Sequence, residues 1–387
     1  MKLTVHGALS VRQRGLSLIE LLVAMVIGLI VTLAVTSVIT VGEGKRRTTT
    51  STNDMDQAGA YAAYLLDRAV RSAGSSLTQS TQPTDRGVFG CRLNVAFKSA
   101  SLLPASAFPA PFAKNFKAAS DLRVAPVLIA KSQSDAGSDV LVVMGGDAVA
   151  GGVPRGLTDP GSANTLSMDN TVGISTDDLV LVSQNGTADC LLEQVTGTST
   201  KVLTVGGTYY TAGKTTSLQT LAASTSTYVT PLGNPANGNV QFQLFGVGDS
   251  STLYGYDLLQ GGGTATAQAL ADGVIQMRAL YGLDTNGDGI LDAWADPGAT
   301  GYDISTVMTT TATLRQIVAV RVALVMRSAS KERDPVSAAS LTLFGDAVDA
   351  SKKSLAQTVT LTGADDTYYR YRVVDFTVPL RNMLLLP

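Results

Sequence analysis

The strongest constraint on this chain is an almost uninterrupted apolar run near its N-terminus. Residues 16–41 read LSLIELLVAMVIGLIVTLAVTSVITV and carry a single charged side chain, Glu20. As an α-helix this run would measure ~39 Å, which exceeds the ~30 Å hydrocarbon core of a bilayer. It is too long for the apolar part of a secretory signal peptide, so we predict a membrane-spanning helix.

Basic side chains flank the run on both sides, so charge does not set its orientation. Lys2, Arg12 and Arg14 precede it, and residues 45–47 read KRR. The positive-inside rule counts these two groups as nearly equal. Two cysteines and the absence of a second long apolar run favour an exported C-terminal part.

The residues around Glu20 form a specific pattern. Residues 12–15 read RQRG, and residues 16–22 read LSLIELL, so a basic segment and a glycine precede an apolar stretch with glutamate at its fifth position. This pattern resembles the processing motif of type IV prepilins and type II secretion pseudopilins. The resemblance implies that a prepilin peptidase cleaves between Gly15 and Leu16 and that the new amino group of Leu16 is methylated. Leucine stands where phenylalanine is commonest in that family.

Glu20 requires an explanation, because a carboxylate in a membrane helix costs about 2–3 kcal/mol unless it reaches the interface or a partner. One interpretation is a side chain that extends to the nearby membrane boundary. The resemblance implies a second one, in which Glu20 pairs with the N-terminal amine of a neighbouring subunit. Such charge compensation is strongest in the apolar core of a filament.

The helix is predicted to continue beyond the membrane into an amphipathic half. Gly74 is well placed to end it, because glycine accepts the left-handed conformation that follows many helices. Gly42 and Gly44 weaken the helix between its two halves, so we expect it to be loosened there. The apolar residues of the second half recur every three or four positions: Ala58, Tyr61, Ala62, Leu65, Leu66, Ala69, Val70 and Ala73.

Beyond Gly74 the sequence pattern changes to short apolar runs bounded by Gly, Ser and Asp, which is typical of buried strands. Residues 274–283 fit either a strand or a helix. The Gly/Ser/Thr-rich stretches 152–176 and 197–226 are predicted to be long surface loops or small excursions. The predicted strands are 139–144, 178–183, 191–195, 240–245, 316–326 and 369–378.

The expected fold is therefore of the α+β class, with a long N-terminal helix packed on a large β-rich head. We predict a leader at 1–15, a helix at 16–74 that is transmembrane in its first half, and an exported head at 75–387.

Five further pieces of the chain form an ordered set. They are DRAVRSAG at 67–74 leading to Gly90 and Cys91, SDVLVV at 138–143, DDLVLV at 177–182 before Cys190, GVI at 273–275 running into YGLD at 281–284, and LRN at 380–382. Together, and in this order, they resemble minor pilins of the PilW type. The resemblance implies a pilin-like fold and a minor pilin that takes part in type IV pilus assembly, priming the filament or sitting in its tip complex. A head of ~310 residues is bulky for a subunit repeated throughout a filament.

The partners implied by this resemblance are the prepilin peptidase, other minor and major pilins, and inner-membrane lipid before assembly. The expected location is the inner membrane, as a single-pass protein with a periplasmic head, and later the pilus on the cell surface. Two alternatives share the N-terminal motif: a minor pseudopilin of a type II secretion system, and a calcium-dependent tip adhesin.

The side-chain inventory argues against an enzyme. The single histidine, His6, lies in the predicted leader, so the mature chain has none for Ser-His-Asp or Cys-His catalysis or for the usual zinc site. The net charge is −2, and removal of three basic leader residues makes it −5. We therefore predict no direct binding of nucleic acid.

Cys91 and Cys190 are the two cysteines, and neither lies in a CxxC motif. In an exported protein we expect them to form a structural disulfide, with free buried thiols as the alternative. Closing a loop of this length would stabilise the fold by ~4 kcal/mol on the chain-entropy model.

No cofactor is predicted except for a calcium ion at one loop. Residues 284–292 read DTNGDGILD, which fits the first nine positions of a calcium-binding loop. Ala295 stands where the bidentate acid of a complete loop would be, and Asp296 comes one residue late. Two interpretations stay open: a weak calcium site, or a turn satisfied by its own hydrogen bonds. The candidate ligands are Asp284, Asn286, Asp288, Ile290 and Asp292.

Overall fold

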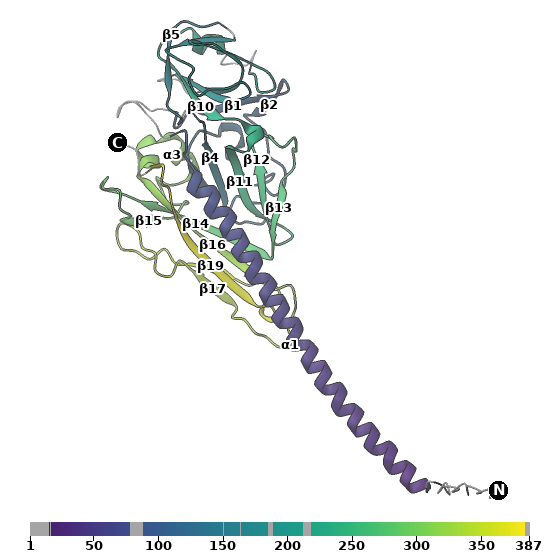
Figure 1. Cartoon of the computed structure of the whole chain (residues 1–387). Helices are drawn as coiled ribbons and strands as arrows, with labels where there is room; N and C mark the ends of the chain where they lie inside the picture. Colours follow the sequence, from purple (N-terminus) through teal and green to yellow (C-terminus); the bar gives the residue numbers. More distant parts are fainter. Residues whose placement is uncertain are drawn as a thin grey trace, which may run out of the picture. The chain divides into compact units, whose positions relative to one another are not determined.

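The computed structural model describes residues 15, 17–77, 88–149, 151–162, 164–184, 189–211 and 218–383. Leu16 and leader residues 1–14, which include His6, lie outside these described residues. The chain (Figure 1) divides into two units, Met1–Asn53 and Asp54–Pro387.

Helix α1 (Leu18–Ser72) is a single α-helix of 55 residues. The loosening predicted near Gly42 and Gly44 is not observed. An isolated glycine costs only about 1 kcal/mol relative to alanine, which is too little to interrupt a helix that is otherwise well formed. The threonine run that follows is also accommodated, since the Thr48 hydroxyl donates to the carbonyl of Gly44 at 3.1 Å.

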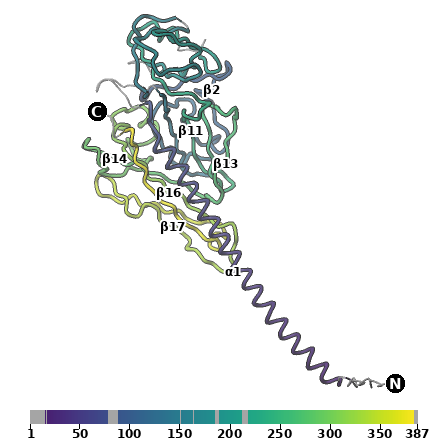
Figure 2. The backbone as a smooth tube through the Cα atoms, in the orientation of Figure 1, coloured from purple at the N-terminus to yellow at the C-terminus, as the bar shows by residue number. Residues whose placement is uncertain are grey.

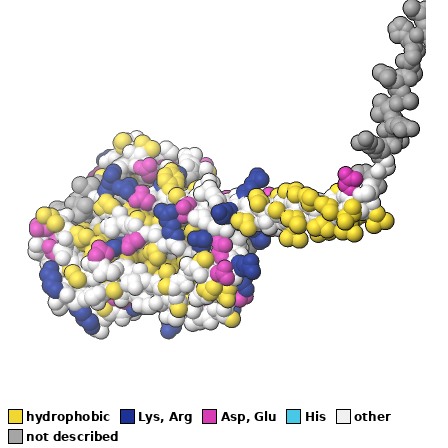
Figure 3. Space-filling model, turned by 90° about the horizontal axis from the view of Figure 1, so that it is seen from below, with side chains coloured by type: hydrophobic (Ala, Val, Ile, Leu, Met, Phe, Trp, Pro, Cys, Tyr) yellow, Lys and Arg dark blue, Asp and Glu magenta, His cyan; other side chains and the backbone are white. Residues whose placement is uncertain are grey.

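In the first unit, the apolar side chains of α1 are exposed all around the helix (Figure 3). Leu18, for example, is 82% exposed, and the stretch carries few charged groups. Among the described residues, α1 is the one helix long and apolar enough to cross a membrane. The predicted transmembrane helix is therefore supported.

The second unit contains two antiparallel sheets that frame the last part of α1 (Figure 2). Within the described residues, one sheet has the strand order β13-β12-β11-β4-β3, and the other has the order β15-β14-β16-β19. Residues 274–283, which the sequence left undecided, form strand β14. The bounds are β3 Val127–Ala130, β4 Val140–Gly146, β11 Val240–Gly248, β12 Thr252–Asp257, β13 Gln268–Asp272, β14 Val274–Leu283, β15 Ala293–Ala295, β16 Ile317–Arg327 and β19 Tyr371–Pro379.

The chain between β4 and β11 in the sequence forms a closed β-barrel. Its six described strands pair in the ring β8-β7-β10-β5-β6-β9 and back to β8, and β1 adds to β8 from outside (Figure 1). The polar stretches 152–176 and 197–226 are small excursions rather than long loops, because they contribute strands to this ring. The bounds are β1 Arg92–Phe97, β2 Ala100–Leu103, β5 Arg155–Asp159, β6 Thr165–Met168, β7 Leu179–Gln184, β8 Asp189–Thr198, β9 Val202–Gly206 and β10 Thr227–Gly233.

The remaining described elements are short. A two-stranded sheet of β17 (Ser340–Leu343) and β18 (Gln357–Thr360) covers Phe344 and Ala347 in a small cluster on β14 and β16. The short helices are η1 Ala118–Asp121, α2 Leu218–Ala222, η2 Pro235–Asn237, α3 Ile304–Thr309, α4 Thr311–Gln316 and η3 Asp366–Tyr368.

The last part of α1 is packed into the main hydrophobic core. Gly59 is close to β16 and β19, where an added Cβ would lie 3.2 Å from Met326 and 3.1 Å from Val374. The predicted apolar face is correct in its buried members, Ala62, Leu66, Ala69, Val70 and Ala73. The other three predicted members are not buried: Tyr61 is exposed, and Ala58 and Leu65 are half-buried, because the buried stripe is narrower than the periodicity suggested.

Candidate functional site

Gly15, the described residue of the predicted cleavage site, precedes helix α1, which begins at Leu18. Gly15 is exposed and not helical, and an added Cβ would meet no atom within 4 Å. An open backbone without a side chain suits entry into a protease cleft. Of the two predicted cleavage residues, Gly15 is described and Leu16 is not, so cleavage and methylation stay predictions.

Ser17 and Glu20 cap the start of α1 reciprocally. The Ser17 hydroxyl accepts from the Glu20 amide at 3.3 Å, and the Glu20 carboxylate accepts from the Ser17 amide at 3.4 Å. This is the capping-box arrangement, in which a serine and a glutamate three residues apart satisfy free amides of the first turn. Ser17 is not among the residues predicted above, although the spacing S-x-x-E is a readable signal for this cap.

The cap bears on how Glu20 is tolerated in an apolar helix. Its carboxylate has a hydrogen-bond donor within its own chain, and it lies at the positive end of the helix dipole. Both effects lower the cost of a charge near the membrane boundary. Pairing of Glu20 with a neighbouring subunit's amine stays a prediction.

At its other end, α1 is held by residues that are far away in the sequence. The Asn382 side-chain amide donates to the carbonyl of Ala73 at 2.9 Å and to that of Ser72 at 3.5 Å. The Ser72 hydroxyl is 2.7 Å from Oε1 of Gln241 on β11. Gly74 follows with a φ of +76°, as expected of a residue that ends a helix. Two PilW-like pieces, 67–74 and 380–382, therefore meet here.

A third PilW-like piece, at 138–143, ties the two sheets of the head together. Asp139 is buried, and its carboxylate accepts from the amide of Ala279 and from Nη1 of Arg278, each at 2.9 Å. The neighbouring Ser138 hydroxyl accepts from the Met277 amide at 3.2 Å. Burial raises the pKa of Asp139, and Arg278 opposes that rise. The role of this piece is structural, since it joins the start of β4 to β14.

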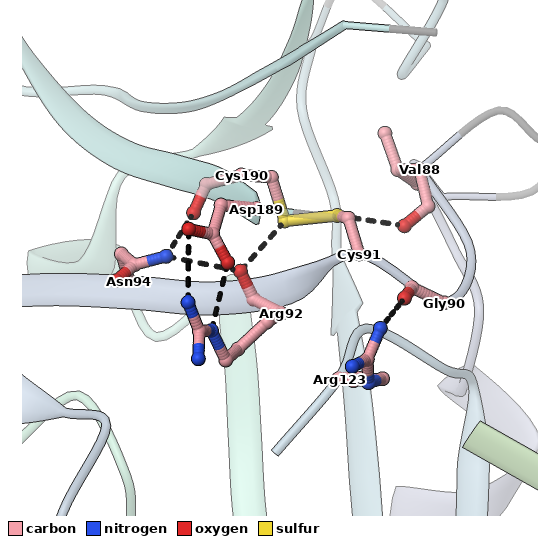
Figure 4. The surroundings of a disulfide bond; sticks show 8 residues. All are labelled: Val88, Gly90, Cys91, Arg92, Asn94, Arg123, Asp189 and Cys190. Atoms are coloured by element: carbon pink, nitrogen blue, oxygen red, sulfur yellow. Dashed lines mark hydrogen bonds and ion pairs between the residues drawn. A yellow bond between two sulfur atoms is a disulfide. The ribbon is translucent and has the colours of Figure 1, made fainter. Parts of the chain in front are cut away.

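Cys91 and Cys190 form a disulfide with a Cα–Cα distance of 5.6 Å (Figure 4). The predicted disulfide is therefore supported. Beside it, the Arg92 guanidinium contacts both oxygens of Asp189, at 2.7 and 3.0 Å. Together these pairs fix β1 against β8, and so fix the barrel to the rest of the head.

In the loop 284–292, side-chain oxygens bind backbone amides of the same loop. The Asp284 carboxylate accepts from the amides of Asn286, Gly287 and Gly289 at 3.2, 2.6 and 2.7 Å. Loss of water contact would raise the pKa of Asp284, but these bonds outweigh it and hold the pKa below its usual value. Asp288 accepts from the amide of Ile290 at 2.8 Å.

Asp292 also accepts hydrogen bonds within the loop, whereas Asp296, the acid that comes one residue late, pairs with a residue outside it. Asp292 accepts from the amide and hydroxyl of Thr285, both at 2.8 Å, and Asp296 pairs with Lys131 at 2.6 Å. Within the described residues, no group of three or more His, Cys, Asp or Glu side chains is arranged to hold a metal ion. Calcium binding stays a prediction.

Comparisons with known proteins match both ends of the chain. Residues 240–382 match the family Type IV Pilus-assembly protein W, and residues 11–36 match the prokaryotic N-terminal methylation motif. No curated protein and no solved structure gives a significant match. The two family matches confirm the resemblance stated from the sequence: the chain matches a PilW-type pilin with a prepilin-like N-terminal motif.

Proposed function

We propose that this protein is a minor pilin that takes part in type IV pilus assembly, where it primes the filament or occupies its tip complex. The observation that carries the proposal is helix α1, which joins an exposed apolar half to a half buried in the head. Exposed apolar surface of this extent needs a lipid or protein environment. A bilayer before assembly and a bundle of pilin helices afterwards supply it in turn.

The steps follow from the N-terminal segment. A prepilin peptidase cleaves after Gly15, and the amine of Leu16 becomes the new N-terminus. Glu20 then attracts that amine in a neighbouring subunit, which sets the axial position of one helix against the next. Before assembly the protein spans the inner membrane once with its head in the periplasm, and afterwards it lies in the surface pilus beside other minor and major pilins.

The match over residues 240–382 favours a pilus over a type II secretion system, since the N-terminal motif alone does not separate the two. The head is the part that carries this distinction. No described feature of the head points to catalysis, and the proposed role is one of packing and contact.

The test is deletion of the gene followed by complementation with variants. Glu20→Ala should insert and be cleaved but restore few surface pili, because the apolar core then lacks the charge that pairs with the amine. Glu43→Ala is the matched control, since it removes an exposed acid of the same helix outside the apolar run, and it should restore normal piliation. Electron microscopy of pili and mass spectrometry of the sheared fraction measure the outcome. Normal piliation in the deletion strain would contradict the proposal.

A further inference from the structure

The apolar part of α1 is followed by three consecutive basic residues. Lys45, Arg46 and Arg47 come after the apolar run and the short segment GEG at 42–44. All three are exposed and lie within the unbroken helix. Among the described residues, the side chains of Lys45 and Arg46 have no hydrogen-bond or ion-pair partner. Two cations next to a membrane-spanning helix are therefore available to a ligand.

The helix places these cations at one height and on different sides. Consecutive residues of an α-helix advance by about 1.5 Å and turn by about 100°, so residues 45–47 lie within ~3 Å along the axis and fan over ~200°. The Thr49 hydroxyl donates to the carbonyl of Lys45 at 3.0 Å, which is compatible with a regular helix here. We call residues 45–47 the basic ring. It suits ligands arranged around the helix, whereas an interface with one protein partner would be one-sided.

The distance between Glu20 and the basic ring matches the thickness of a bilayer. Along α1, Glu20 and Lys45 are separated by ~38 Å, which lies between the ~30 Å of the hydrocarbon core and the ~40–45 Å that includes the headgroups. With the capped Glu20 at one boundary, the ring lies in the headgroup layer at the other. Long Lys and Arg side chains extend their charges to the phosphates of such a layer.

The basic ring belongs to a chain that is otherwise acidic. In residues 16–53 the other charged side chains are Glu20 and Glu43, and residues 54–387 carry a net charge of −6. Glu43 precedes Arg47 by four residues, a spacing at which opposite charges on a helix attract each other. Lys45 and Arg46 are therefore the main cations for a ligand. An anionic surface attracts the ring and repels the bulk of the chain.

In the proposed orientation the ring stands on the exported side of the membrane. The positive-inside rule disfavours basic residues there, and removal of the leader takes away the cations at the opposite end of the apolar run. A ligand that compensates this arrangement must be anionic and must lie at the depth of the headgroups. Lipid phosphates meet both conditions.

We infer that the basic ring binds the phosphate groups of anionic phospholipids in the leaflet next to the head. Lys45 and Arg46 make the main contacts, and these contacts fix the depth of α1 in the bilayer before assembly. Binding in that leaflet rests on the proposed function, which supplies the orientation. The measurement below detects the lipid directly and does not require pili.

The test is selective retention of anionic lipid by the detergent-solubilised full chain. The chain is mixed with equal amounts of anionic phosphatidylglycerol and zwitterionic phosphatidylcholine and repurified, and its bound lipid is measured by mass spectrometry. Each basic residue near an anionic lipid surface favours binding about fivefold, so Lys45→Gln with Arg46→Gln should lower the preference for phosphatidylglycerol by ~25-fold. All variants keep the leader, so its basic residues contribute equally.

Two control variants separate this site from general charge effects. Lys352→Gln with Lys353→Gln removes two exposed cations of the head and should keep the preference. Lys45→Arg with Arg46→Lys should keep it as well, because the ring offers charge and not a fixed shape. Millimolar inorganic phosphate should leave the lipid bound, and its displacement would indicate a site for free phosphate instead.

Equal retention of the two lipids by the unsubstituted chain would overturn the inference, and this comparison needs no variant. An unchanged preference in Lys45→Gln with Arg46→Gln would overturn it too. If that variant then made few pili, the ring would serve a protein partner. Normal pili in the deletion strain would refute the proposed function and leave the lipid measurement standing.

Discussion

At the scale of single residues, Glu193 is an acid in an apolar interior. It is fully buried on β8, on the same face as Leu191 and Val195 of the barrel core. Its carboxylate accepts hydrogen bonds from the amide of Thr211, at 3.2 Å, and from the Thr211 hydroxyl. Burial outweighs these bonds and raises the pKa of Glu193 from 4.5 to about 7.

This pKa makes the stability of the barrel depend on pH. The folded state holds the Glu193 proton more tightly than the unfolded chain does. The stabilisation that protonated Glu193 contributes is therefore complete below pH 4.5 and is lost as the pH rises through about 7. Over this pH range the free energy of unfolding falls by about 3 kcal/mol, at 1.36 kcal/mol per unit of pKa shift. We expect a lower Tm at pH 8 than at pH 5 for the detergent-solubilised chain, and a flatter profile for Glu193→Gln. Asp159→Asn, at an exposed position of β5, is the control and should leave the profile unchanged.

A second residue-scale prediction concerns the loop 284–292. If it binds calcium, the Asp288 and Asp292 carboxylates turn from loop amides and hydroxyls toward the ion, and millimolar calcium should release heat and raise the Tm. Asp288→Ala should abolish both effects, while Asp249→Ala, in another exposed turn, should not. Titration calorimetry without a signal at millimolar calcium would leave the loop as a turn that satisfies its own polar groups.

At the scale of elements, the hydrogen bond from Asn382 to the C-terminal end of α1 can be tested by itself. Asn382→Ala removes the hydrogen bond to the Ala73 carbonyl, and a helix-end carbonyl loses its partner, at a cost of about 1 kcal/mol. Chemical unfolding of the solubilised chain should show a lower midpoint with an unchanged slope. Arg381→Ala, at the exposed neighbouring position, is the control. Equal stability of the two variants would show that the cap contributes little.

The sequence predicted those helices and strands whose apolar residues form a continuous run or recur at a regular spacing. The apolar runs at 139–144 and 178–183 are strands β4 and β7, and the amphipathic half of α1 is buried along the predicted stripe. The barrel strands β5, β6 and β9 could not be read, because each contributes only one or two inward side chains to a narrow core. Leu157 on β5 is such a case, standing alone among polar neighbours.

The residues of the candidate site could be predicted only where they lie close together in the sequence. Gly15 and Glu20 follow from a contiguous motif, whereas Asn382 acts on Ser72 and Ala73 across more than three hundred residues. No spacing rule relates positions so far apart. The same holds for Asp139 and Arg278: Asp139 lies in a PilW-like piece, but the piece does not indicate its contact with Arg278.

At the scale of the whole molecule, the disulfide decides how firmly the barrel and the sheets act as one body. Replacement of Cys91 and Cys190 by serine should cost about 4 kcal/mol by the chain-entropy estimate for a loop of 99 residues. Limited proteolysis should then cut within the barrel before the sheets. Reductant should reproduce the effect in the unmodified chain and have none on the double variant. An identical cleavage pattern in all samples would show that the ion pair and strand pairing suffice.

The cap that Asn382 places on α1 also has a consequence for timing. Helix α1 precedes the rest of the head in the chain, so the ribosome makes it before most of the head. Its end receives the amide of Asn382 only after the described head has been synthesised. A chain interrupted earlier would keep its apolar helix, but the last turn of that helix would lack these hydrogen bonds. Completion of the head thus distinguishes a finished chain from a fragment.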